Sequence, residues 1–276
     1  MVTDDDGGAA AHPAVSLRSA SLSFGRRRLW HDLDLDIRPG EFLAVLGPNG
    51  SGKTSLLRVL LGLQELDSGT ATVNGHPLHR GSRAFGYIPQ QKSFAPETPL
   101  RARDLVGLGV DGHRWGLRRG GAAYRRTVDA LLEKVGASSY ADAPVGRLSG
   151  GEQQRLRAAQ ALATDPQVLL CDEPLLSLDL HHQQAVSRLI DNQCREHNTA
   201  VVFVTHEINP IIDYVDRVLY LAGGQFRVGR PREVMTSEVL SDLYDSRVDV
   251  IHNNGRIVVV GLPDATTHHH AEVAQP

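Results

Sequence analysis

The sequence predicts an α/β fold with a mainly parallel core sheet into which a helical segment is inserted. Three continuous apolar runs have the pattern of strands buried on both faces, at residues 42–46, 168–171 and 200–204. Segments of helical periodicity lie between other apolar runs, and this alternation favours parallel strands joined by helices. Between residues 91 and 163 one helical pattern follows another with no strand pattern between them, which indicates the insertion.

The chain is expected to contain a leader, one main domain and a tail. Residues 1–14 are polar and rich in glycine and alanine, and we expect them to be a disordered leader. The main domain is predicted over residues 15–250, with residues 91–163 as its helical subdomain. Residues 251–276 are expected to be the remnant of a hairpin followed by a polar tail, which includes His268-His269-His270.

Hydrophobic periodicity predicts the elements of the main domain in order. Leu33, Leu35 and Ile37 alternate with polar residues, which indicates a half-buried strand, and Pro39-Gly40 predicts a turn after it. Helical patterns cover residues 55–63, 102–108, 122–135, 180–197 and 208–214. Further strand patterns, the last two forming a hairpin, cover residues 218–221, 248–251 and 256–260.

Composition excludes several classes of protein. The chain has 276 residues, of which 41% are hydrophobic and 22% charged, and this balance is typical of a folded globular protein. Two cysteines cannot form a disulfide framework, and no apolar run approaches the roughly 20 residues that span a bilayer. Asp4, Asp5 and Asp6 lie where a signal peptide needs positive charge. The formal net charge of −3 favours no broad contact with nucleic acid, so we expect no nucleic-acid partner.

The strongest functional motif is a glycine-rich phosphate-binding loop, the P-loop, at residues 47–54. It fits the pattern of Gly, four residues, Gly-Lys-Ser/Thr. Glycines let backbone N–H groups approach a polyphosphate, and the following helix presents its N-terminus to the same anion. Lys53 is one of only three lysines in the chain, and its presence at the required position supports the P-loop assignment, because arginine does not replace lysine there. The residues expected to bind the nucleotide here are Gly47, Pro48, Asn49, Gly50, Ser51, Gly52, Lys53 and Thr54.

Two adjacent carboxylates follow the apolar run that ends at Cys171. If this strand lies beside the P-loop strand, Asp172 comes close to a Mg²⁺ ion held by the hydroxyl of Thr54. Glu173 then points toward the terminal phosphate, where a carboxylate can orient or deprotonate water. Together the P-loop and the carboxylates predict hydrolysis of a nucleoside triphosphate, or phosphoryl transfer.

A second glycine-containing motif, here called the signature segment, lies upstream of Asp172. Its sequence is Leu148-Ser149-Gly150-Gly151-Glu152-Gln153-Gln154-Arg155. As local structure it predicts the start of a helix with Ser149 as its cap. The segment closely resembles the signature of the ABC ATPase family and has the same place in the chain order. The resemblance extends over about residues 15–250, and it implies an ABC-type P-loop nucleotide-binding domain with an antiparallel β subdomain and an inserted helical subdomain.

The resemblance also implies roles for single residues. Glu173, His206 and Gln90 would be catalytic, and the Mg²⁺ ligands would be Thr54, Gln90 and Asp172. Further contacts to the nucleotide would come from Ser149, Gly150, Gly151 and Asp179. Phe24 would stack on adenine, with simple core packing as its alternative and Trp30 as a nearby rival for the same role.

An ABC transporter ATP-binding subunit would use ATP and Mg²⁺ in a defined assembly. The resemblance implies a head-to-tail homodimer in which each ATP lies between the P-loop of one subunit and Ser149 and Gly151 of the other. Its partners would be an integral membrane permease and, indirectly, an extracytoplasmic metal-binding protein. Such a subunit would be peripheral, on the cytoplasmic face of the cell membrane.

Two segments, Phe85–Gly116 and Gly229–Gly261, resemble ATPases of zinc and manganese importers, so a divalent metal ion is the expected cargo. The alternatives are an iron-chelate or haem importer, a soluble ABC ATPase without a transport role, and a regulatory subunit without activity. A P-loop kinase would have no use for the signature segment. His252 and His268 to His270 could bind Zn²⁺, but a solvated tail is the favoured interpretation.

Overall fold

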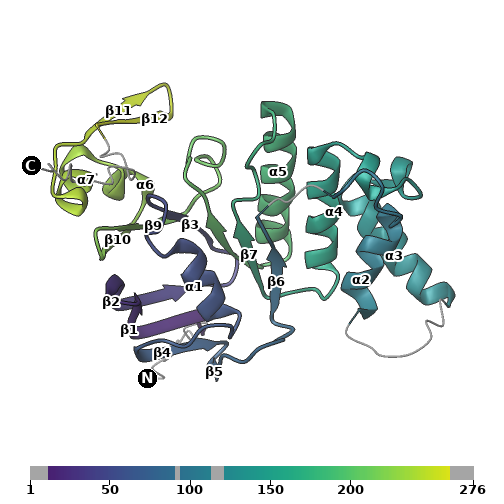
Figure 1. Cartoon of the computed structure of the whole chain (residues 1–276), viewed down its shortest axis with the longest axis horizontal. Coiled ribbons are helices and arrows are strands. Elements are labelled where there is room, and N and C mark those ends of the chain that lie inside the picture. The colour runs from purple at the N-terminus through teal and green to yellow at the C-terminus, as the bar shows by residue number, and fades with distance from the viewer. Residues whose placement is uncertain (1–11, 91–93, 113–120, 262–276) are drawn as a thin grey trace, which may run out of the picture.

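The structure is a computed structural model that describes residues 12–90, 94–112 and 121–261. These residues form a core of two sheets, with a group of helices at one end of the molecule and a small hairpin near the other (Figure 1). Residues 1–11 of the predicted leader and the tail that contains His268 to His270 lie outside the described residues. Within the described part of the chain, no helix is both long enough and apolar enough to cross a bilayer.

A six-stranded sheet forms the centre, in the order β10-β9-β3-β8-β7-β6. Its strands are β3 (Phe42–Leu46), β6 (Phe85–Ile88), β7 (Val168–Asp172), β8 (Ala200–Val204), β9 (Arg217–Ala222) and β10 (Gln225–Gly229). All neighbours are parallel except β10, which pairs antiparallel with β9. Every residue of β3, β7 and β8 is buried, as the continuous apolar runs predict. The prediction of a mainly parallel core sheet is therefore confirmed.

A second, antiparallel sheet packs beside the first, in the order β2-β1-β4-β5. It contains β1 (Val15–Phe24), β2 (Arg27–Ile37), β4 (Ser68–Val73) and β5 (His76–Pro77). Helix α1 (Lys53–Leu60) lies between the two sheets, and its Leu56, Leu57 and Leu60 join the same hydrophobic core as Leu33 and Leu35 of β2. The expected antiparallel β subdomain is present.

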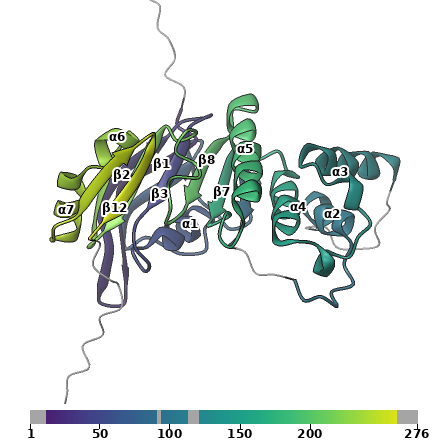
Figure 2. The same cartoon turned by 90° about the horizontal axis from the view of Figure 1, so that it is seen from above.

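Three helices form a separate layer beyond α5 in both views (Figures 1 and 2). They are α2 (Ala102–Asp111), α3 (Ala122–Lys134) and α4 (Gly150–Leu162), with short 3-10 helices at Ser138–Tyr140 and Val145–Arg147. Val106, Val128 and Leu156 come from one helix each and are buried together in a core of their own. This layer is the expected helical subdomain.

The C-terminal part of the chain packs back onto the central sheet. It comprises α5 (Leu180–Glu196), α6 (Pro231–Val234), α7 (Ser237–Tyr244), β11 (Asp249–Asn253) and β12 (Arg256–Val260). The last two strands form a hairpin that turns at Asn254 and Gly255, both with positive φ, as a two-residue hairpin loop requires. Ile257 of this hairpin is buried in the same core as Phe42 and Phe203. The predicted domain boundaries stay predictions, and the one after residue 250 falls within β11.

The predicted helix over residues 208–214 is wrong. This segment forms consecutive turns, in which Ile211 N–H donates to Ile208 O (2.9 Å) and Tyr214 N–H to Ile211 O (2.9 Å). Pro210 disfavours helical geometry at the residue before it, Asn209. The Asn209 side chain is instead bound to the backbone of Ile257, on the distant hairpin. Apolar spacing alone could not show that tertiary contact.

Candidate functional site

The P-loop connects the end of β3 to the start of α1, and two of its glycines are fixed by packing inside the chain. A Cβ atom on Gly47 would lie 2.0 Å from the carbonyl oxygen of Leu221, and one on Gly52 would lie 2.6 Å from the indole ring of Trp30. Both glycines also have positive φ, which disfavours any other residue. The loop therefore needs glycine for its own fit against β9 and β2, in addition to the expected approach of a phosphate.

Trp30 and Phe24 occupy opposite environments. Trp30 is fully buried beneath the P-loop and cannot stack on a base, so the rival assignment of that role to it is wrong. Phe24 is 75% exposed and lines a cavity of about 340 Å³ together with the P-loop. The full set of residues around this cavity is Phe24, Arg27, Leu29, Asn49, Gly50, Gly52, Lys53, Thr54, Ser55, Gln90 and Glu173.

The Lys53 amine lies inside the P-loop. Its Nζ donates to Gly47 O (2.7 Å) and Pro48 O (2.9 Å), and only 5% of the residue is exposed. Burial lowers the pKa of Lys53, while the charges of Glu173 and Asp172 act in the opposite direction. Beside it, the buried hydroxyl of Ser51 has no hydrogen-bond partner among the described residues. A buried ammonium group and an unused hydroxyl in one glycine-rich loop fit a phosphate ligand.

Asp172 lies at the end of β7 and faces the P-loop helix. Its Oδ1 accepts a hydrogen bond from Thr54 Oγ1 (3.3 Å), and its Oδ2 accepts one from Tyr87 OH (3.4 Å). Burial raises the pKa of Asp172 above its ordinary value, and the hydrogen bond from Thr54 offsets part of that effect. A hydroxyl and a carboxylate are hard oxygen ligands of the kind that Mg²⁺ prefers. These oxygen atoms fit a Mg²⁺ ion, whose charge would also offset the cost of burying the Asp172 carboxylate.

Glu173 is the point at which the predicted catalytic residues meet. Its Oε2 lies 3.4 Å from Gln90 Nε2 and 3.6 Å from His206 Nδ1. Its backbone N–H donates to Val204 O (2.9 Å), which fixes it at the end of β8. Glu173 also has a φ of 47°, a costly conformation for a residue with a side chain. Strain of this kind is typical of functional sites, because the surrounding structure must hold it in place.

Ser149 begins helix α4 as the sequence predicts. Its Oγ accepts from Glu152 N–H (3.3 Å), and the Glu152 carboxylate accepts from Ser149 N–H (2.8 Å). These two bonds form a capping box. Within the described part of this chain, the structure places Ser149, Gly150, Gly151 and Asp179 outside the lining of the P-loop cavity. It thus brings the P-loop, Asp172, Glu173, Gln90 and Phe24 together, but not the signature segment.

His182 connects the signature segment to the start of α5, a contact that the sequence analysis missed. A Cβ atom on Gly151 would lie 1.9 Å from the Cδ2 atom of His182, so the imidazole ring packs directly on this glycine. Asp179 holds the ring, because its carboxylate lies 2.8 Å from His182 Nδ1 and accepts from His182 N–H (2.9 Å). These bonds lower the pKa of Asp179. Gly151 therefore serves packing within one chain, whereas the sequence suggested only room for an anion.

Tyr87 is a second functional residue that the sequence analysis passed over. It lies on β6, which pairs in parallel with β7, and its hydroxyl reaches the carboxylate at the end of β7. Burial raises the pKa of Tyr87 to about 12, so the hydroxyl remains a donor at neutral pH. In the sequence, its position three residues before Gln90 was the one indication that Tyr87 lies near the site.

Sequence comparison finds that this chain is similar to ATP-binding proteins of ABC transporters. The family described as "ABC transporter" matches residues 30–176. The sulfate/thiosulfate import ATP-binding protein CysA of Bacillus cereus is 32% identical over 248 residues, which cover 88% of this chain and 69% of that protein. The manganese transport system ATP-binding protein MntB of Halalkalibacterium halodurans is 27% identical over 251 residues, which cover 91% of this chain and 100% of that protein.

Solved structures of ABC transporters and of ATP-binding cassettes have a similar fold. A metal-chelate type ABC transporter in an inward-facing conformation superposes with a TM-score of 0.76 and 26% identity, covering 90% of this chain and 96% of that one. An ATP-binding cassette in a dimeric, post-hydrolysis state with bound ADP and Pi superposes with a TM-score of 0.66 and 26% identity. That match covers 78% of this chain and 98% of the other.

The contact between Gly151 and His182 can be tested by unfolding. We expect Gly151→Ala to lower the free energy of unfolding by about 1–3 kcal/mol, because an added methyl group overlaps the imidazole ring. Removing the ring as well, in Gly151→Ala/His182→Ala, should cost less than the sum of the two single changes, as measured by urea unfolding. His76→Ala, an exposed histidine on β5, is the control, and a double variant with it should show no such interaction. Simple additivity of Gly151→Ala and His182→Ala would contradict the contact.

Proposed function

The chain belongs to the ABC transporter family, and from this premise we propose that it is the ATP-binding and ATP-hydrolysing subunit of an importer. The observation that carries the proposal is the arrangement around Glu173. Gln90 Nε2 and His206 Nδ1 lie 3.4 Å and 3.6 Å from its carboxylate. Glu173 and Gln90 line the P-loop cavity, and His206 lines an adjoining cavity of about 150 Å³ that also includes Glu173. Such an arrangement suits attack of water on a terminal phosphate, since the carboxylate can orient or deprotonate the water.

Each residue of the site has a chemical task in this proposal. Lys53 and the P-loop amides bind the phosphates of ATP, and Phe24 stacks on the adenine ring. Thr54, Asp172 and Gln90 would hold Mg²⁺, which neutralises charge on the phosphates when bound. Glu173 accepts the proton of water, and His206 donates a hydrogen bond to the terminal phosphate. Tyr87 holds Asp172 in position from β6.

We place the signature segment on the nucleotide of a second subunit. Among the residues that the structure describes, Ser149 and Gly151 of the same chain do not line the P-loop cavity, so they would not cover a phosphate bound there. The N-terminus of α4 attracts anions and could cover that phosphate in a head-to-tail dimer. A dimeric cassette with bound ADP and Pi is among the structural relatives, which supports this arrangement.

A membrane permease would supply the pathway for the cargo. A cavity of about 310 Å³ lies between the core and the helical subdomain, lined by Leu61, Phe85 and the half-exposed Leu108. A hollow with an exposed leucine at its edge and less exposed apolar side chains in its lining suits docking of a short helix from another protein. The subunit would then be peripheral on the cytoplasmic face of the membrane, with the permease contacting an extracytoplasmic binding protein.

The proposed cargo is a divalent metal ion, zinc or manganese. The manganese relative aligns over its whole length, and the metal-chelate transporter aligns over 96% of its chain. The sulfate relative, which is 32% identical, makes an oxyanion the second candidate. The described residues contain no cluster of metal ligands that could sense the cargo, and His252 Nε2 contacts the carbonyl oxygen of Met235 (2.9 Å). His268 to His270 lie outside the described residues.

Replacing Glu173 tests the hydrolytic centre. We expect Glu173→Gln to lower the rate of phosphate release at least 100-fold, because the proton acceptor is lost, while ATP binding is preserved. Lys53→Ala should instead weaken ATP binding itself, measured by titration with a fluorescent ATP analogue. The control is Glu207→Gln, a neighbouring exposed glutamate. Normal phosphate release from Glu173→Gln would remove this residue from its assigned role.

Asp172 is expected to lower the stability of the nucleotide-free chain. Its pKa is raised on folding, so the ionised form is disfavoured in the folded chain at neutral pH. This cost decreases as pH falls below the folded pKa and is gone below the ordinary pKa of the unfolded chain. Asp172→Asn should therefore raise Tm at pH 7 while abolishing Mg²⁺-dependent hydrolysis. Asp36→Asn is the matched control of opposite sign, because Arg18 lowers the pKa of Asp36, whose stabilisation is lost only in acid. A lower Tm for Asp172→Asn would contradict this account.

Uptake in a deletion strain identifies the cargo. We expect loss of radiolabelled manganese or zinc uptake, restored by the wild-type gene and not by Glu173→Gln. Loss of sulfate uptake alone would transfer the proposal to an oxyanion importer. Unchanged uptake of all three, together with failure to purify with a multispanning membrane protein, would contradict the importer.

A further inference from the structure

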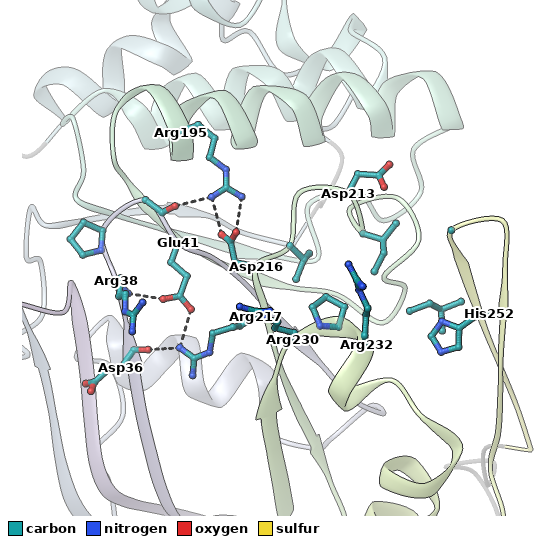
Figure 3. A pocket seen from close by; sticks show the side chains of 17 residues that line it. Asp36, Arg38, Glu41, Arg195, Asp213, Asp216, Arg217, Arg230, Arg232 and His252 are labelled. Atoms are coloured by element: carbon teal, nitrogen blue, oxygen red, sulfur yellow. Dashed lines mark hydrogen bonds and ion pairs between the residues drawn. The ribbon is translucent and has the colours of Figure 1, made fainter. Parts of the chain in front are cut away.

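Figure 3 shows a second cavity. Gly40 and Glu41, which precede β3, line it, whereas the P-loop follows β3, so the two cavities lie at opposite ends of the central sheet. The second cavity has a volume of about 1190 Å³, more than three times that of the P-loop cavity at 340 Å³. Its walls are the turn between β2 and β3, the end of α5, the start of β9, α6 and the β11–β12 hairpin. Known ligand pockets are commonly 300–1,000 Å³, so this one can hold a sizeable small molecule. None of the roles proposed above uses it.

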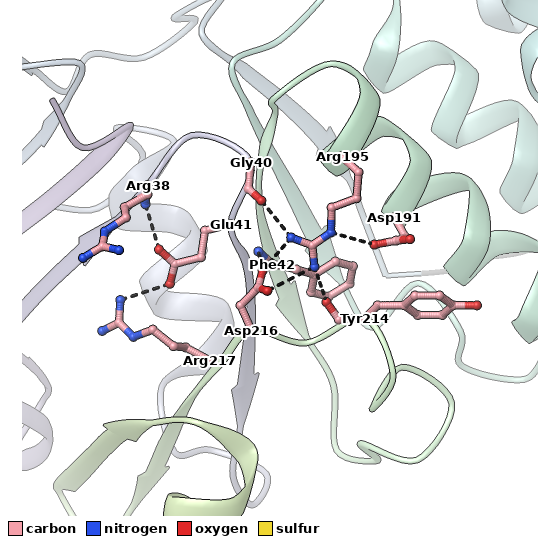
Figure 4. Close-up of polar contacts among 9 residues, drawn as sticks. All are labelled: Arg38, Gly40, Glu41, Phe42, Asp191, Arg195, Tyr214, Asp216 and Arg217. Atoms are coloured by element: carbon pink, nitrogen blue, oxygen red, sulfur yellow. Dashed lines mark hydrogen bonds and ion pairs between the residues drawn. The ribbon is translucent and has the colours of Figure 1, made fainter. Parts of the chain in front are cut away.

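The floor of this cavity is a network of ion pairs that leaves few carboxylate groups free (Figure 4). Arg195 donates to both carboxylate oxygens of Asp216, at 2.9 and 3.2 Å, and Arg217 donates to Glu41 at 3.0 Å. Asp36, also in the lining, accepts from Arg18 at 2.8 Å. Most carboxylates around the cavity are therefore already engaged, and they hold the floor in one geometry.

Among the described residues of the cavity walls, guanidinium groups without a partner outnumber carboxylates without a partner. Arg38, from the turn after β2, and Arg232, from α6, line the cavity from opposite sides in Figure 3. Their side chains have no hydrogen bond or ion pair with other described residues, and Arg230 is a further cationic group beside them. Among the described carboxylates that line the cavity, only Asp213 also has no hydrogen bond or ion pair from its side chain. Free guanidinium groups bind carboxylates and phosphates through paired N–H donors.

Apolar side chains complete the wall between these charges. Ile212, Val215 and Ile257 line the same cavity. We infer that this cavity binds a small molecule that carries two or more carboxylate or phosphate groups on an apolar body, with Arg38 and Arg232 as its anchors. Separated anchors favour a ligand with charges at both ends over a single inorganic ion.

The hairpin wall links this cavity to the hydrolytic centre. Asn209 Nδ2 donates to Ile257 O, and Asn209 Oδ1 accepts from Ile257 N–H, both at 2.8 Å. Asn209 follows His206 by three residues along one continuous loop. A ligand held by Arg38 and Arg232 also contacts Ile257 in the hairpin wall, restrains this loop through Asn209, and so lowers the rate of hydrolysis. This second step rests on the proposed role of His206, whereas the binding site itself does not.

Calorimetry with two defined probes tests the site. Citrate and pyrophosphate are titrated separately into the full chain carrying Lys53→Ala, in which the P-loop is weakened, and into the wild-type chain. We expect binding of at least one probe to both chains, and a Kd at least tenfold higher after Arg38→Gln/Arg232→Gln. Arg125→Gln, on α3 and exposed, is the matched control and should leave the Kd unchanged. Citrate alone would indicate a polycarboxylate ligand, and pyrophosphate alone a phosphate ester.

The outcomes separate the two steps of the inference. No binding of either probe at millimolar concentration overturns the site, and binding that survives the double arginine substitution overturns its location. With free Mg²⁺ held constant, the bound probe should lower kcat for ATP at least twofold in the wild type. Asn209→Ala should keep the binding and lose this effect, with Asn209→Asp as a milder second variant. Binding without any change in kcat overturns the coupling, and absence of ATP hydrolysis overturns the proposed function but not the site.

Discussion

The parallel pairing of β3, β8, β7 and β6 is the constraint on which the hydrolytic site depends. Because the strands are parallel, their carboxyl ends lie at one edge of the sheet, and each end carries a different functional group. The P-loop follows β3 and His206 follows β8. Asp172 is the last residue of β7, Glu173 comes next, and Gln90 follows β6. A shift of one residue in any pair would reverse the side chains of that strand. The fully buried strands make such a shift costly, so the sheet core fixes the geometry of the site.

The site also places charges where they oppose stability. Lys53 and Asp172 are almost fully buried, and burial moves the pKa of each toward its neutral form. The compensating partners inside the chain are weak, because the Thr54 and Tyr87 contacts to Asp172 are long, at 3.3 and 3.4 Å. In the proposed function, a bound triphosphate would supply the negative charge opposite Lys53, and its cation the positive charge opposite Asp172. The same burial that lowers stability without ligand therefore strengthens binding when the ligand arrives.

The sequence predicted those parts of the fold and site that depend on local pattern. Strands β3 and β8 were predicted to the residue, because a continuous apolar run has clear ends. The N-cap at Ser149 follows from its own four residues. Trp30 and His182, by contrast, act on glycines of distant segments, Gly52 and Gly151. A glycine in the sequence shows that space or conformation is restricted, but not which neighbour restricts it, and the helix predicted through Asn209 failed for the same reason.

The two ends of the sheet are held by different kinds of interaction, and this difference bears on regulation. At the P-loop end, Lys53 and Asp172 are buried charges, and the hydrogen bonds to Asp172 inside the chain are long. At the far end, Arg195 donates hydrogen bonds of 2.8–3.2 Å to Gly40, Tyr214 and Asp216. Those donors and acceptors are paired with one another, so the network holds the floor of the far cavity in one geometry. Among the residues that the structure describes, the hydrogen bonds between the hairpin and the loop of His206 both involve the side-chain amide of Asn209. A signal from the far cavity to hydrolysis would therefore pass through a contact that one substitution can remove, without disturbing either end of the sheet.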